Sequence, residues 1–91
     1  MRVNFTEIKL LNLDGEPIGE FHKVVAQRIY YSNHPNLDLV EIALKINQGE
    51  PVELRDSDLE AIQKIVLDPA SGIALFARKA FKDFIENEKA K

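Results

Sequence analysis

The hydrophobic pattern at the start of the chain is typical of β-structure. Residues 3–13 mix β-branched, aromatic and leucine side chains, and the Asp-Gly pair at 14–15 is a turn signal that precedes Glu16-Pro17-Ile18. This order predicts a β-hairpin. Its second arm should be short, because proline cannot donate a backbone hydrogen bond to a neighbouring strand.

After Gly19 the pattern takes the period of a helix. A helix over residues 20–31 would place most of its apolar side chains on one face, namely Phe21, Val24, Val25, Ile29 and Tyr31. His34 precedes Pro35, and the residue before a proline is steered away from the α region. We therefore expect a corner at residues 33–36.

Residues 37–48 predict a second helix, which is apolar around most of its circumference. Such a helix should lie centrally and contact several neighbours. Gly49 is a typical C-terminal stop, and residues 50–54 alternate like a very short strand.

Two more helices complete the pattern. Ser57 and Glu60 match a capping box and predict the start of the third helix. Asp68-Pro69 should end that helix and begin the fourth, which runs to about Glu88. The apolar stripe of the fourth helix comprises Ile73, Phe76, Ala77, Ala80, Phe81 and Phe84.

The sum is an α+β fold, mostly α, in which an N-terminal β-hairpin or paired short strands precede about four helices. The 91 residues suit one compact domain, which we place at residues 1–88. The charged end of the chain, residues 89–91, should fray.

The composition of the chain indicates which partners and which cellular compartment to expect. The net charge is -3 and the basic residues alternate with acidic ones, so the electrostatic footprint of a nucleic-acid or membrane binder is missing. The chain has no cysteine, which excludes disulfides and thiolate zinc sites. No apolar run is long enough for a signal peptide or a membrane span, so we expect a small soluble, cytoplasmic protein.

Candidate catalytic chemistry is sparse. The two histidines, His22 and His34, lack metal-ligand spacing, and the four glycines are too dispersed for a phosphate-binding loop. None of the serines lies in a nucleophile elbow. We therefore predict no catalytic residue, no metal site and no cofactor, and we do not expect an enzyme.

A helical wheel suggests four candidate contact residues for a partner, namely Lys23, Arg28, Tyr30 and Leu75. Tyr30 falls opposite Phe21 and beside Lys23, whereas Tyr31 falls at the edge of the core, so the two tyrosines should not share a face. Tyr30 is either an ordinary surface residue or a contact residue, since tyrosine is over-represented at interface hot spots. Lys23 would flank that contact.

Arg28 and Leu75 depart from the pattern of their helices. Arg28 falls within an apolar stripe, so its guanidinium must reach water, pair with a carboxylate or serve a partner. Leu75 falls opposite the apolar stripe of the fourth helix. Together with Tyr30 it is a candidate contact for self-association, as in a homodimer.

The stretch LVEIALKINQGEPVELRDSDLEAIQKIV (residues 39–66) carries a resemblance. A helix with V-x-x-A-x-x-I, a glycine, V-x-L and an acidic capped helix, behind a hairpin with Asp-Gly, resembles small uncharacterised proteins encoded by tailed phages and prophages. Such sequences often place Ser or Thr after V-x-L, where this chain has Arg55. The resemblance implies a phage-derived protein that works by binding another protein, and it brings no catalytic residues.

The leading hypothesis is thus a non-catalytic protein-interaction module. A nucleic-acid-associated regulatory protein is the alternative, and a small enzyme or enzyme subunit is the third possibility.

Overall fold

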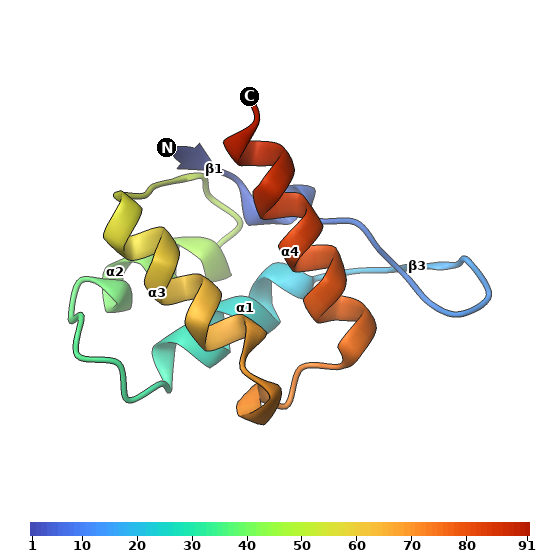
Figure 1. Ribbon diagram of the computed structural model, residues 1–91, viewed down its shortest axis with the longest axis horizontal. Coiled ribbons are helices and arrows are strands. Elements are labelled where there is room, and N and C mark those ends of the chain that lie inside the picture. The colour runs from blue at the N-terminus through green and yellow to red at the C-terminus, as the bar shows by residue number, and fades with distance from the viewer.

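The structure, a computed structural model that describes residues 1–91, places four helices around a short N-terminal segment (Figure 1). This confirms the predicted α+β fold, mostly α. No helix combines the length and apolar character that crossing a membrane would require. In chain order the elements are β1 (Arg2–Val3), the 3-10 turn η1 (Phe5–Glu7), β2 (Leu10–Leu11), β3 (Pro17–Ile18), α1 (Phe21–Tyr30), α2 (Leu39–Asn47), β4 (Val52–Glu53), α3 (Asp56–Leu67), the 3-10 turn η2 (Pro69–Ser71) and α4 (Leu75–Lys89).

The strands form two separate antiparallel pairs. β1 pairs with β4, and β2 pairs with β3 across the turn at residues 14–15, which confirms the hairpin in a shorter form. Residues 3–13, whose pattern suggested the first arm of the hairpin, are not one strand, because η1 separates β1 from β2. The side chain of Asn4 accepts a hydrogen bond from the backbone N–H of Thr6 at 3.0 Å, which caps η1 and interrupts the strand.

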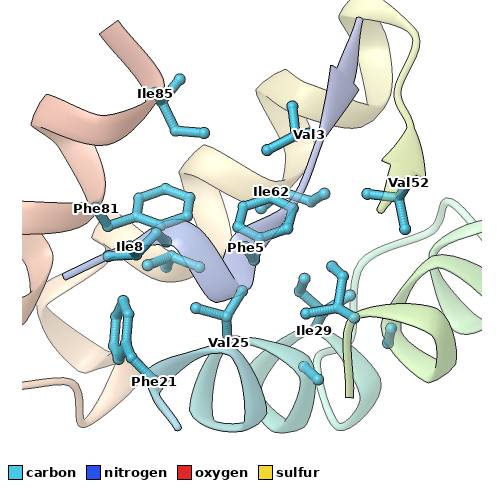
Figure 2. Close-up of a cluster of buried hydrophobic side chains, with 14 of the residues drawn as sticks. Val3, Phe5, Ile8, Phe21, Val25, Ile29, Val52, Ile62, Phe81 and Ile85 are labelled. Carbon is cyan, nitrogen blue, oxygen red and sulfur yellow. The ribbon is translucent and has the colours of Figure 1, made fainter. Parts of the chain in front are cut away.

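The core forms around that interruption. Phe5 points from η1 into the buried cluster, to which all four helices contribute (Figure 2). Its ring stacks on that of Phe81 with centroids 6.1 Å apart and planes 6° apart. The N-terminal segment therefore contributes a central core residue rather than only a surface hairpin.

Helix α2 does not occupy the central place predicted for it. Its buried residues are Leu39, Ala43 and Ile46, while Val40 and Leu44 are exposed. It packs mainly against α1, with a smaller contact to β4. The prediction assumed that every apolar face is covered, but so short a chain has no further element to lie over α2.

The start of α3 differs from the capping box predicted at Ser57. The helix begins at Asp56, and the carboxylate of Asp58 accepts a hydrogen bond from the backbone N–H of Arg55 at 3.1 Å. The residue that reaches back to the N-cap is therefore Asp58 and not Glu60. An acidic residue near a helix N-terminus also interacts favourably with the helix dipole.

Helix α4 begins later than the sequence predicts. Asp68 caps the separate turn η2 by accepting from the N–H of Ala70 at 2.8 Å, and α4 starts only at Leu75. Phe76 is then 47% exposed, so its predicted burial is wrong. The buried row has a spacing of four residues and consists of Ile73, Ala77, Phe81 and Ile85.

Two glycines allow a matched test of how backbone conformation affects stability. Gly49 has φ +80°, and a Cβ there would lie 3.4 Å from Cγ2 of Thr6, whereas Gly19 lacks positive φ and has open space around it. We expect Gly49→Ala to lower the free energy of unfolding by about 1 kcal/mol. Gly19→Ala should leave it unchanged or raise it by up to about 1 kcal/mol, because alanine restricts the unfolded chain. Urea denaturation measures both, and equal losses would contradict this account.

Candidate functional site

Helices α1 and α2 lie side by side and leave a hollow of about 250 Å³ between their exposed faces. We name this hollow the α1–α2 groove. None of its lining residues is charged. They are Ala26, Gln27, Tyr30, Tyr31, Ala43, Leu44 and Asn47.

Two adjacent tyrosines form one end of the groove. Tyr30 is the last residue of α1, and Tyr31 follows with φ -96° and ψ 8°, outside the helical geometry. Their rings meet edge to face, with centroids 5.2 Å apart and planes at 82°. The predictions that these side chains occupy different faces and that Tyr31 packs against the core are both wrong, because the wheel assumed that the helix continues through Tyr31. Tyr31 is 79% exposed.

Small residues form the floor of the groove and larger ones its walls. Ala26 and Ala43 are buried, so they let the two helices approach closely. Leu44 lines the α2 side and is 44% exposed, while the amides of Gln27 and Asn47 offer hydrogen-bonding groups. This combination of apolar walls and a few neutral polar groups is typical of a binding pocket.

The apolar surface continues beyond the groove. Val40 precedes Leu44 by one helical turn and lies on the same face of α2. Both side chains are exposed. Neighbouring exposed apolar residues indicate an interaction surface more often than isolated ones do.

A buried carboxylate fixes the corner that joins α1 to α2. Asp58 is only 3% exposed and accepts hydrogen bonds from Nδ2 of Asn36 and Nε of Arg55, each at 3.0 Å. Arg55 also donates from Nη2 to Asp38 at 2.8 Å. The guanidinium of Arg55 lowers the pKa of Asp58 from its ordinary value of 3.8 to about 2. The corner is thereby tied to the start of α3.

The histidines lie in separate places. Nδ1 of His34 accepts a hydrogen bond from the N–H of Asn36 at 3.1 Å inside the corner. His22 lines a different hollow, beside the β2–β3 hairpin. Nowhere in the structure do three His, Asp or Glu side chains gather as a metal ion would require.

Of the four contact residues suggested by the sequence, only Tyr30 lines the groove. Lys23 is exposed and lies 3.5 Å from the carboxylate of Glu20. Arg28 is exposed as well, and its guanidinium lies over Gly72, where an added Cβ would be 3.3 Å from Nη2.

Leu75 is 75% exposed and lines a separate hollow together with Leu67 and residues of α4. The structure therefore places Tyr30 and Leu75 in different hollows. They do not form one continuous lining.

Sequence reasoning missed Tyr31, Leu44 and Asn47. A signal was present in α2, where the apolar positions exceed what one buried face needs. An excess of this kind indicates either several neighbours or an exposed apolar face, and the sequence alone could not decide between them.

Comparison of the chain with protein-family models, with curated proteins and with solved structures finds no match. The α1–α2 groove is therefore identified from its geometry and chemistry alone.

Proposed function

We propose that this protein is a non-catalytic interaction module that binds a protein partner through the α1–α2 groove. The observation that carries the proposal is the pair of exposed tyrosines that line one hollow together with Leu44 and two buried alanines. Tyrosine presents a large, rigid surface with a hydroxyl at its edge, and it is enriched among residues that dominate binding energy.

The lining of the groove indicates the chemistry of the partner. A nucleic acid or another phosphate-bearing ligand would need cationic side chains, and the lining has none. A neutral apolar side chain fits the walls, while the neighbouring backbone of a partner can hydrogen-bond to Gln27, Asn47 and the tyrosine hydroxyls. The occupant is thus an apolar side chain on a protein segment, which agrees with the protein-binding role implied by the resemblance to phage proteins.

The backbone that leads away from the groove is anchored, which favours binding. The chain leaves Tyr31 into the corner, where the amide of Asn36 donates to the buried carboxylate of Asp58 at 3.0 Å. A site that is already ordered loses less conformational entropy when the partner docks.

Affinity capture from lysate of the native host tests the proposal. Tyr30→Ala removes one wall of the groove, and Phe76→Ala is the matched control, because Tyr30 and Phe76 are both 47% exposed. We expect one or more proteins to be retained by the wild type and by Phe76→Ala but lost with Tyr30→Ala. With the purified partner, Tyr30→Ala should weaken binding at least ~10-fold, or about 1.4 kcal/mol.

Two results would contradict the proposal. One is retention of the same proteins by all three versions, which would place the contact elsewhere. The other is recovery of nucleic acid whose binding falls steeply with added salt, which would favour the nucleic-acid alternative.

A further inference from the structure

The β2–β3 hairpin projects from the body of the molecule, past α4 (Figure 1). We name residues 10–18 the arm. At its tip Leu13 is fully exposed, with a relative accessibility of 103%. Leucine in this position buries nothing within its own chain, so it does not stabilise the fold by packing.

The tip nevertheless has a defined hydrogen-bonding pattern. The side-chain oxygen of Asn12 accepts hydrogen bonds from the N–H groups of Asp14 at 3.0 Å and Glu16 at 2.9 Å. The N–H of Asn12 donates to the carbonyl of Glu16 at 2.8 Å, and Gly15 supplies the positive φ of the turn. Leu13 is thus presented on a turn closed by hydrogen bonds.

Leu13 is not the only exposed apolar residue of the arm. Leu11 lies opposite Pro17 in the hairpin, and both are exposed. β2 ends at Leu11, and Leu13 follows in the turn. Several exposed apolar side chains on one projecting arm are typical of a docking element.

We propose that the arm of one chain inserts Leu13 into the α1–α2 groove of a second copy, and that the second copy does the same in return. This inference rests on the proposed function, since it uses the same groove and names its occupant. Leu13 provides the neutral apolar side chain that the lining of the groove requires. Because Leu13 is fully exposed in the single chain, it does not occupy its own groove.

The lining of the groove does not repel the acidic tip of the arm. Asp14 and Glu16 follow Leu13 at the tip of the arm. The groove has no acidic lining residue, and Lys23 lies one helical turn before Gln27 on α1. The pair between Lys23 and Glu20 is exposed and therefore weak, so Lys23 can face the acidic tip instead.

A reciprocal arrangement enlarges the contact area. One leucine side chain in one hollow buries too little surface for a stable dimer, which requires about 1,200 Å² or more. A two-fold dimer makes the contact twice and can add Leu11 of both arms and Val40 beside both grooves. Closed two-fold dimers are the commonest form of self-association.

Sedimentation of the whole chain over about 1 to 300 µM tests the inference, because dimer formation depends on concentration. We expect a species of twice the 10.3 kDa chain mass. Leu13→Asp and Leu44→Asp should each weaken its formation at least ~10-fold, since each introduces a carboxylate into the apolar contact. Leu75→Asp is the matched control on a separate surface and should leave the dimer unchanged.

Mixing the two variants gives a sharper test. A heterodimer of Leu13→Asp with Leu44→Asp retains one contact in which both the arm and the groove are intact. The mixture should therefore dimerise more strongly than either variant alone. Circular dichroism confirms that both variants are folded, which is expected because both side chains are exposed.

A wild-type chain that stays monomeric at all concentrations would overturn the inference. So would a dimer that survives both Leu13→Asp and Leu44→Asp, or one that is lost only with Leu75→Asp. A monomeric chain whose capture of a different protein still depends on Tyr30 would overturn the second copy as occupant but leave the proposed function intact. If the chain stays monomeric and no captured protein depends on Tyr30, both proposals are wrong.

Discussion

Replacing Phe81 with alanine should lower the free energy of unfolding by about 3 to 5 kcal/mol. Phe81 is completely buried, and its ring stacks on Phe5 with centroids 6.1 Å apart. The substitution removes apolar burial, leaves a cavity and ends the ring contact. A domain of this size has a total stability on the order of 5 to 15 kcal/mol, so one substitution removes a large part of it.

Urea denaturation followed by circular dichroism measures the effect. If Phe81→Ala does not fold, Phe81→Leu retains most of the volume and should lose about 1 to 2 kcal/mol. Phe76→Ala on the same helix is the control, because its 47% exposed side chain should contribute about 1 kcal/mol or less. Similar losses for Phe81→Ala and Phe76→Ala would mean that the stacked pair is not central to the core.

The helices could be predicted because their signals are local. The helix predicted at residues 20–31 is observed as α1, Phe21–Tyr30, and the stop at Gly49 is confirmed by its left-handed backbone, φ +80°. Helical periodicity, and the glycine or proline that ends a helix, depend only on residues a few positions apart. These signals can therefore be interpreted without knowledge of the rest of the chain.

The central position of Phe5 could not be predicted in this way. Whether Phe5 is buried depends on Phe81 near the other end of the chain, and no local pattern records that contact. The cap that Asn4 provides for η1 also competes with strand formation, because an asparagine side chain can hydrogen-bond to nearby backbone groups. The run of β-forming residues therefore predicted neither the turn η1 nor the burial of Phe5.

The groove escaped prediction for two physical reasons. A helical wheel assigns an angle to every residue, but Tyr31 lies beyond the end of α1, so its angle had no meaning. The apolar circumference of α2 was taken as buried, although nothing in the chain covers Val40 and Leu44. Tyr30 was identified as a candidate contact, and only the structure showed that Tyr31 lies beside it.

Arg55 was the position where the chain departs from the phage-like pattern, and the structure gives that residue a role. An arginine cannot cap a helix by accepting hydrogen bonds, since all its side-chain nitrogens are donors. Instead it donates to Asp58 and Asp38 and links the corner to α3. Asp58, which reaches back to the Arg55 N–H, supplies the acceptor.

Replacing Asp58 with asparagine should lower the free energy of unfolding by about 2 kcal/mol at neutral pH, and the loss should depend on pH. The folded pKa of Asp58, about 2, lies below its ordinary value of 3.8, mainly because Arg55 hydrogen-bonds to the charged form. Protonation therefore favours the unfolded chain. The stabilisation is fully present above the unfolded pKa and is lost as the pH falls through the folded pKa.

The difference in stability between wild type and Asp58→Asn should therefore shrink between about pH 4 and pH 2. Urea denaturation at a series of pH values measures that difference directly. Asp38→Asn is the control, because Asp38 contacts the same guanidinium but its side chain is 71% exposed, so its removal should change little. A difference of equal size at pH values near 7 and near 2 would show that packing, and not the charge of Asp58, stabilises the corner beside the groove.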